Sequence, residues 1–95
     1  MDVQWDPWKA AVNLRRHGVS FVEAQSVFFD DNAILLDDPI HSADEDRFVL
    51  LGLSDRLRLL VVSHTLRDDG RTIRIISARK AIAAESDQYN ERMKR

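Results

Sequence analysis

Three basic residues lie within or directly after an apolar run in the C-terminal third of the chain. In the stretch IRIISARKAIAAESDQY (73–89), Arg74 lies inside the apolar run, and Arg79 and Lys80 follow directly after it. The apolar run predicts a buried β-strand, and the residues after it predict a helix because they contain neither glycine nor proline. A single arginine at such a junction is usually a solvated surface group, whereas a cluster of cations favours an anion site.

RNA is one anion whose chemistry these residue types suit. Metal-free cleavage requires a base for the 2′-hydroxyl proton, cations for the dianionic phosphorane, and an acid for the leaving 5′-oxygen. Arg79 and Arg74 suit the phosphorane because a guanidinium donates two parallel hydrogen bonds and stays charged. His64 suits proton transfer near neutral pH, although a lone histidine on an apolar strand is about as often structural. Lys80 is assigned to substrate binding.

Weaker candidates lie around this group. Arg67 follows the strand that carries His64, and Tyr89 on the predicted last helix has a hydroxyl and a ring that suit hydrogen bonding or stacking on a base. Trp5 and Trp8 also have rings that suit stacking, but tryptophans in a small domain are more often packing residues.

Composition indicates one small domain spanning residues 1–95. The chain has 95 residues, 44% of them apolar, which suffices for one modest core. Cysteine is absent, which excludes disulfides, thiolate metal sites and thiol nucleophiles. No apolar run approaches the length of a membrane span, and the first residues lack the features of a signal peptide. We therefore expect a cytoplasmic protein with no membrane association.

Charge is unevenly distributed along the chain. The net charge of -2 argues against non-specific coating of nucleic acid, which depends on phosphate neutralisation. Residues 30–46 contain seven acidic residues and no Lys or Arg, whereas residues 66–95 contain eight cations and five acids. A local cationic site is therefore compatible with the negative total.

The acidic segment raises a metal site as an alternative. Acceptable ligands are His41, Asp44, Glu45, Asp46 and His64. His41 and Glu45 are four residues apart, but this segment is predicted as an acidic loop and not as a helix, and acidic turns are usually solvated. The chain also lacks a G-x-S-x-G motif and a glycine-rich phosphate loop. We expect no metal and no other cofactor.

Two helices are predicted near the N-terminus. Asp6 is a favourable N-cap, Pro7 suits the first helical position, and Gly18 suits the left-handed C-terminal position. A capping box from Ser20 to Glu23 predicts the start of a second helix, whose core face carries Phe21, Ala24, Val27 and Phe28.

Strands follow these helices. Four runs predict strands at 33–36, 47–54, 57–65 and 71–79, separated by short turns as in an antiparallel meander, and residues 3–5 suit an edge strand. The order β-α-α-β-β-β-β-α predicts an α+β fold with the helices on one side of the sheet. The nearly continuous apolar run before His64 predicts a central strand covered on both faces.

Period-two alternation assigns the faces of the strands. It places His64 with Leu60 and Val62, and it places Arg74 and Ala78 on the face opposite to Arg79. Burying these polar groups without partners is unfavourable, so we expect them to open toward water or a ligand at one end of the sheet. The groups concerned are His64, Arg67, Arg74, Arg79 and Lys80.

Three segments resemble the BrnT toxins of BrnT/BrnA type II toxin–antitoxin modules. They are WDPWKAAVNLRRHGVSFVEAQSVF (5–28), HSADEDRFVLLGLS (41–54) and IRIISARKA (73–81), in the family's order and over nearly the whole chain. The resemblance implies a RelE-like fold and an endoribonuclease that cleaves mRNA and arrests translation. It also implies a BrnA-like ribbon-helix-helix antitoxin that binds operator DNA and represses the operon together with the toxin.

Carried over residue by residue, the resemblance adds four basic residues to the RNA-binding candidates. These are Lys9, Arg15, His17 and Arg47. Two alternatives stay open. One is a toxin-like partner and co-repressor that does not cleave RNA, which the lack of Lys and Arg between Lys80 and Arg92 favours. The other is an interaction domain unrelated to RNA, in keeping with the low net charge.

Overall fold

The computed structural model describes residues 1–37 and 47–94. Its elements in chain order are β1 (Asp2–Gln4), α1 (Pro7–His17), α2 (Phe21–Ser26), the 3-10 helix η1 (Val27–Phe29), β2 (Ile34–Leu36), β3 (Arg47–Leu53), β4 (Leu59–Arg67), β5 (Thr72–Lys80) and α3 (Ala83–Met93). None of these helices has the length and apolar character that crossing a membrane requires. The α+β class and the predicted order of elements are confirmed.

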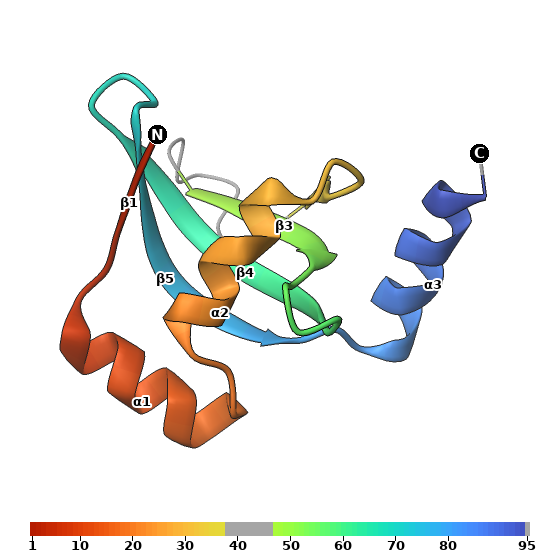
Figure 1. Cartoon of the computed structure of the whole chain (residues 1–95), viewed down its shortest axis with the longest axis horizontal. Coiled ribbons are helices and arrows are strands. Elements are labelled where there is room, and N and C mark those ends of the chain that lie inside the picture. The colour runs from red at the N-terminus through yellow and green to blue at the C-terminus, as the bar shows by residue number, and fades with distance from the viewer. Residues whose placement is uncertain (38–46, 95) are drawn as a thin grey trace.

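The strands form one five-stranded sheet in the order β1-β5-β4-β3-β2. The strands β2 to β5 pair antiparallel as a meander, and β1 adds to the edge of β5 in parallel, which makes the sheet mixed. The predicted central strand is β4, where Leu60, Val61 and Val62 are all buried. In Figure 1, α2 lies in front of the sheet, α1 lies at the lower left, and α3 lies at the right.

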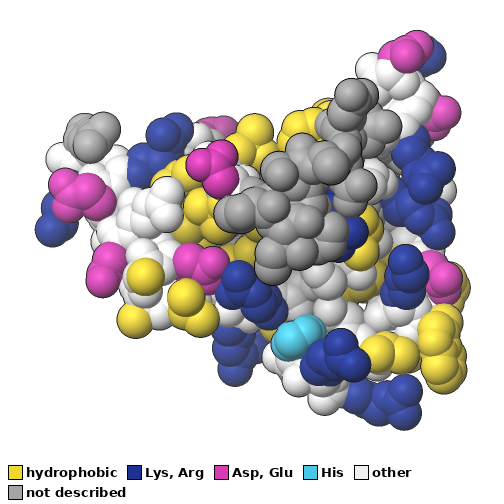
Figure 2. Space-filling view, turned by 180° about the vertical axis from the view of Figure 1, so that it is seen from behind, with side chains coloured by type: hydrophobic (Ala, Val, Ile, Leu, Met, Phe, Trp, Pro, Cys, Tyr) yellow, Lys and Arg dark blue, Asp and Glu magenta, His cyan; other side chains and the backbone are white. Residues whose placement is uncertain are grey.

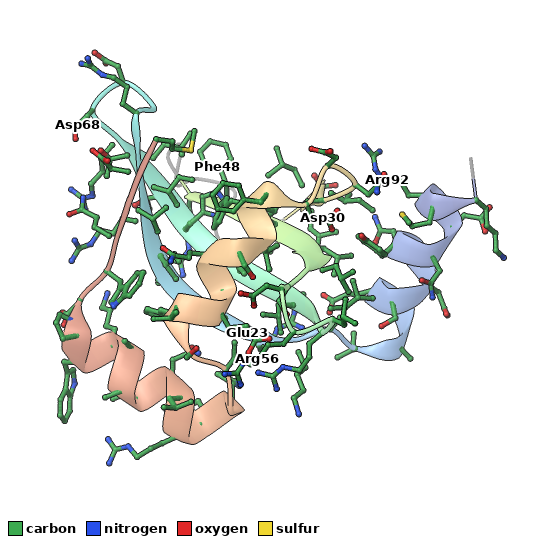
Figure 3. All side chains as sticks on the ribbon, in the orientation of Figure 1. Glu23, Asp30, Phe48, Arg56, Asp68 and Arg92 are labelled. Carbon is green, nitrogen blue, oxygen red and sulfur yellow. The ribbon has the colours of Figure 1, made fainter. Side chains whose placement is uncertain are left out.

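The ends of α1 and α2 follow the predicted capping residues. The Asp6 side chain accepts a hydrogen bond from the Trp8 N–H at 2.8 Å, and Gly18 ends α1 with φ 68°. The Ser20 hydroxyl accepts from the Glu23 N–H at 3.0 Å. Glu23 does not complete the capping box. Its carboxylate instead accepts hydrogen bonds from Ser54 and Arg58, at the two ends of the β3–β4 turn. Figure 3 labels Glu23 on α2 and Arg56 in this turn.

Two hydrophobic clusters lie on opposite faces of the sheet. The larger one packs α2 and the residues around it against β4 and β5, and includes Phe21, Val27, Val62 and Ile75. The smaller one packs Tyr89 of α3 against Val49, Leu51 and Val61. The expectation that all helices lie on one side of the sheet is therefore wrong, because α3 turns onto the other face after Lys80.

A β-bulge in β5 reverses the expected faces of its second half. Ser77 pairs with Ser63 and Ile75 pairs with His64, so Ile76 has no partner on β4. This extra residue shifts the alternation by one position. Arg79 consequently lies on the same face as Arg74, and Ala78 lies in the helix-facing core. The expected separation of Arg74 from Arg79 is wrong for this reason.

Asn13 joins α1 to β5 just beyond the bulge. Its amide donates to the Ala78 carbonyl at 2.8 Å, and its carbonyl accepts from the Ala78 N–H at 3.1 Å. The same amide donates to the Val19 carbonyl at 3.0 Å. Because β1 pairs with β5 only up to Arg74, this edge of β5 is open to a side-chain partner. Asn13 therefore fixes the C-terminal half of α1 beside β5.

Candidate active site

The sheet face opposite α2 carries rows of polar residues. In the strand register, Arg47, Thr65 and Arg74 form one row, Val49, Ser63 and Ser77 the next, and Leu51, Val61 and Arg79 a third. Tyr89 of α3 packs on the third row and on Val49 of the second. This face is seen in Figure 2, where Lys, Arg and His side chains are exposed.

A cavity of about 210 Å³ lies on this face, where β5 approaches both α1 and α3. The groups in its lining that have functional side chains are His17, Asp37, Ser63, Ser77, Arg79 and Glu85. They come from α1, the end of β2, β4, β5 and α3. The cavity thus combines a guanidinium, an imidazole, two carboxylates and two hydroxyls, which is a set able to bind a phosphate and to transfer protons.

Arg79 is held in this cavity by Glu85 from the first turn of α3. Its two terminal nitrogens donate to the two carboxylate oxygens at 2.8 and 3.0 Å. Glu85 also accepts from the Ile82 N–H at 2.9 Å. The hydrogen bonds from Arg79 lower the pKa of Glu85, and those to Glu85 raise the pKa of Arg79. Both groups are therefore charged at neutral pH, with a planar guanidinium of defined orientation.

His17 reaches the cavity from the last turn of α1. It is half-buried, and the Asn13 contact with Ala78 one turn earlier fixes the helix beside β5. Sequence analysis assigned His17 to RNA binding. The structure places it in the same cavity as Arg79 and Glu85, with His17 on α1 and Glu85 on α3. Its imidazole is therefore a candidate for proton transfer.

The first polar row extends the cationic character of this face. Arg47 and Arg74 flank Thr65 in the register. Arg47 Nε and Thr65 Oγ1 are buried, and neither has a hydrogen-bond partner among the described residues. Buried polar groups are normally hydrogen-bonded, so this row is suited to a polar ligand or to the remainder of the chain.

His64 lies away from the cavity, on the helix-facing side of the sheet. It is 4% exposed, and its ring contacts Phe28 edge-on at 4.8 Å and stacks on Phe48 at 5.9 Å between centroids. Burial lowers the pKa of His64, which favours the neutral ring. The expectation that His64 opens toward water or a ligand is wrong, because β4 is central and α2 with η1 covers this face.

Tyr89 is likewise buried, at 4% exposure. Its hydroxyl donates to Asp30 Oδ2 at 2.7 Å, and the same oxygen accepts from the Leu53 N–H at 2.8 Å. Burial and the neighbouring Asp30 raise the pKa of Tyr89 to about 12. Figure 3 labels Asp30 between η1 and α3. The ring and hydroxyl of Tyr89 thus attach α3 to the sheet.

The remaining predicted residues lie in three places. Arg67 is exposed at the β4–β5 turn and pairs with Thr72, whereas Lys80 pairs with Leu60 at the other end of the hairpin. The expectation that all the basic residues cluster at one end of the sheet is therefore wrong. Figure 3 labels Asp68 at the tip of this turn, far from α1 and α3. Lys9 and Arg15 are exposed on α1.

The metal alternative falls largely outside the described residues. His41, Asp44, Glu45 and Asp46 belong to the segment 38–46, which the structure does not describe. Within residues 1–37 and 47–94, no group of three or more His, Asp or Glu side chains is arranged to hold a metal ion.

Sequence analysis missed Glu85, Ser63 and Ser77. Regular alternation along the last strand placed Ser77 and Arg79 on the face opposite to Arg74, so Ser77 was not grouped with the cationic face. The signal that was available for Glu85 is its position in the first helical turn after Arg79 and Lys80, where a carboxylate is favourable and within reach of a basic strand end.

Known proteins show the same architecture and family features. A crystal structure of the Brucella abortus ribonuclease toxin, BrnT, determined at 1.1 Å, superposes with a TM-score of 0.66 at 21% identity. The alignment covers 86% of this chain and 97% of that chain, which shows that the two share a fold. No curated protein sequence matches this chain.

The sequence model of one family matches residues 5–85, which is most of the chain. That family is described as the ribonuclease toxin, BrnT, of type II toxin–antitoxin systems. The protein is therefore a ribonuclease toxin of the type II toxin–antitoxin class. Within that class, the chain belongs to the BrnT family.

Proposed function

We propose that this chain is an endoribonuclease that cleaves single-stranded mRNA, and so arrests translation, by metal-independent attack of a 2′-hydroxyl on the adjacent phosphate. The observation that carries the proposal is the cavity that brings His17, Arg79 and Glu85 together beside two serine hydroxyls. This set supplies phosphate binding and two titratable groups on different elements. We assign the reaction to these protein groups alone, without a metal or other cofactor.

Arg79 and Arg74 bind the scissile phosphate and stabilise the phosphorane. They lie on one face of β5, and Arg79 presents a guanidinium already oriented by Glu85. Orientation before substrate binding lowers the entropic cost of reaching the charged transition state. Lys80, which is exposed and follows Arg79 in the chain, binds the RNA backbone, as does Arg47 in the first polar row.

His17 and Glu85 transfer the protons. In-line displacement places the attacking 2′-oxygen and the leaving 5′-oxygen on opposite sides of the phosphorus, so two separate groups are needed. Glu85, which is charged, accepts the 2′-hydroxyl proton, and His17 protonates the 5′-oxygen. The 2′-O–P bond forms as the P–O5′ bond breaks, which leaves a 2′,3′-cyclic phosphate and a free 5′-hydroxyl.

The activity of the toxin is neutralised by a protein partner. Membership of a type II toxin family implies an antitoxin. We propose a BrnA-like antitoxin with a ribbon-helix-helix domain, which covers the toxin and represses the operon together with it. Operator DNA is contacted only by the antitoxin, in keeping with the net charge of -2 of this chain. Because mRNA is the substrate, the toxin acts in the cytoplasm.

One contact favours a second candidate, a non-catalytic partner and co-repressor. Both terminal nitrogens of Arg79 already bind Glu85, so a phosphate must share or displace this carboxylate. If the Arg79–Glu85 ion pair never separated to admit a phosphate, the protein would bind its antitoxin without cleaving RNA. The two candidates differ in whether the isolated chain degrades mRNA.

The test uses expression from a tightly repressed promoter, with growth, bulk mRNA integrity and soluble protein followed together. We compare the parent with Arg79→Ala, with Arg79→Lys, and with Arg71→Ala as a matched control. Arg71 is an exposed arginine at the β4–β5 turn, distant from the cavity. The proposal expects arrest and mRNA loss for the parent and for Arg71→Ala, and strong impairment for both Arg79 variants.

Purified protein tests the mechanism. Cleavage is measured in excess chelator, and the new RNA ends are analysed for a 2′,3′-cyclic phosphate and a 5′-hydroxyl. Healthy growth and intact mRNA with soluble parent protein would select the non-catalytic partner. Arrest by folded Arg79→Ala at parental strength would keep the enzyme and remove Arg79 from its site.

A further inference from the structure

A groove lies beside the candidate active site, between α1 and β5. Its volume is about 300 Å³, and its lining residues are Trp8, Lys9, Val12, Asn13, Arg16, His17, Ile76 and Ser77. The α1 residues repeat at intervals of four, so they form one face of the helix. His17 and Ser77 line both this groove and the catalytic cavity, which makes the two hollows adjoining parts of one surface.

Trp8 stands in the groove with its ring largely in solvent. It is 69% exposed, whereas Trp5 is partly buried and packs edge-on against Phe21. Trp8 therefore contributes little to the core. Its backbone is nevertheless fixed, because its N–H donates to the Asp6 cap and Pro7 precedes it at the start of α1. A large flat ring held at a rigid helix end has low conformational cost on binding a planar ligand.

Cations accompany this ring along the same face of α1. Lys9 and Arg16 line the groove and are exposed. An aromatic platform combined with cations along a groove is the arrangement by which proteins hold single-stranded nucleic acid, with bases on the rings and phosphates on the charges. A paired base is stacked within its helix and does not present a free face to such a ring.

We propose that the α1–β5 groove is a subsite for an unpaired nucleotide of the cleaved strand, a few nucleotides from the scissile phosphate, with its base stacked on Trp8 and its backbone on Lys9 and Arg16. This inference rests on the proposed function, because the same RNA strand continues from the catalytic cavity. His17 lies nine positions after Trp8 on the helix, which corresponds to a rise of about 14 Å along its axis. At the ~3.4 Å spacing of a stacked strand, the stacked base lies about four nucleotides from the cleavage point, and fewer if the strand is extended.

Binding is measured with single-stranded 2′-O-methyl RNA ten-mers, whose blocked 2′-oxygen prevents cleavage. Removing one base–aromatic contact weakens binding by about 5- to 150-fold, and we expect Trp8→Ala to fall in this range. Trp8→Phe keeps a ring and should restore most of the affinity. Leu14→Ala is the matched control, since Leu14 is 51% exposed on α1 and does not line the groove.

Abasic substitutions in the RNA show whether the contact is to a base. Each base of the ten-mer is replaced in turn by an abasic sugar, and binding is measured with the parent and with Trp8→Ala. The proposal expects one or two positions at which the parent loses affinity and Trp8→Ala loses none further. Equal losses for both proteins at every position would overturn it.

Failure of the subsite is distinguishable from failure of the proposed function. If the parent cleaves RNA and Trp8→Ala binds the ten-mers like the parent, the subsite is wrong and the ribonuclease stands. If the parent neither binds nor cleaves RNA, both fail. If Trp8→Ala keeps RNA binding but escapes neutralisation by the antitoxin, this groove is a protein interface and the subsite is overturned.

Discussion

At the scale of single residues, the assignment of His17 rather than His64 to proton transfer depends on the position of each ring in the fold. His17 lies in the cavity with Arg79, whereas His64 is enclosed by Phe28 and Phe48. A buried ring with a lowered pKa and aromatic neighbours suits packing, because neither face is open to a substrate.

Replacing His64 tests this assignment. His64→Phe places a third aromatic ring between Phe28 and Phe48, and we expect cleavage per folded molecule to change little. A proton-transfer role would instead reduce the rate by about 100-fold or more. The measurement is single-turnover cleavage of RNA, with the folded fraction determined by circular dichroism. His17→Phe serves as the comparison and should lose activity strongly.

At the scale of elements, α3 is attached to the sheet by two side-chain contacts. Tyr89 donates to Asp30, and Glu85 binds Arg79. The Glu85 contact joins α3 to Arg79 in the catalytic cavity. The Tyr89 contact joins α3 to Asp30, which also binds the end of β3. The helix therefore fixes one wall of the site as well as covering the smaller hydrophobic cluster.

Tyr89→Phe removes the hydroxyl and keeps the ring. Because Asp30 is charged and the pair is partly buried, we expect a loss of about 1–3 kcal/mol in the free energy of unfolding. RNA affinity should stay near the parental value, since the hydroxyl contacts Asp30 and not solvent. Urea unfolding and binding of 2′-O-methyl RNA measure the two quantities. Parental stability combined with weakened RNA binding would contradict the attachment role.

At the scale of the whole molecule, the close packing of its layers depends on small residues. Gly52 in β3 leaves no room for a side chain, since a Cβ there would lie 2.7 Å from Val27 Cγ1 and 3.0 Å from the Ala33 Cβ. This contact lets η1 approach the sheet closely. Asp30, which follows η1, is thereby brought within reach of Leu53 and Tyr89.

Stability of the whole molecule is expected to fall steadily with acid. The pKa of His64 is lowered from 6.5 by burial, so below that value the unfolded chain binds a proton that the folded chain resists. Hydrogen bonds from Arg58 lower the pKa of Glu23, and those from Arg79 lower the pKa of Glu85. The pKa of Asp30 is lowered by hydrogen bonds from the Leu53 N–H and the Tyr89 hydroxyl. Their stabilising contribution is complete above their ordinary values of 4.5 and 3.8 and is lost as pH falls through the folded values.

Thermal melts from pH 8 to pH 3 check this expectation. The melting temperature should decline first below about pH 6.5 and then more steeply below about pH 4.5, the ordinary pKa values of histidine and glutamate. His64→Phe should remove the first decline and leave the second. A melting temperature that is independent of pH between 8 and 5 in the parent would contradict the assignment of His64 as a buried neutral ring.

The sequence by itself determined the local features of this protein. Asp6 with Pro7, Gly18 and Ser20 predicted the ends of two helices, and the turn residues between apolar runs predicted the meander. These signals act over a few residues, through caps, fixed dihedrals and alternation, so they can be identified without the fold. The resemblance of three segments to the BrnT toxins added the family, which the match over residues 5–85 confirms.

Only the tertiary structure decided which of the basic and titratable residues face one another. The unpaired Ile76 puts Arg79 on the same face of β5 as Arg74, and Asn13 brings His17 to β5 through contacts between residues 65 positions apart in the chain. The burial of His64 depends on η1 and β3, and the orientation of Arg79 depends on α3. A bulge and long-range contacts of this kind leave no periodic signal in the sequence, because they are selected by packing between distant elements.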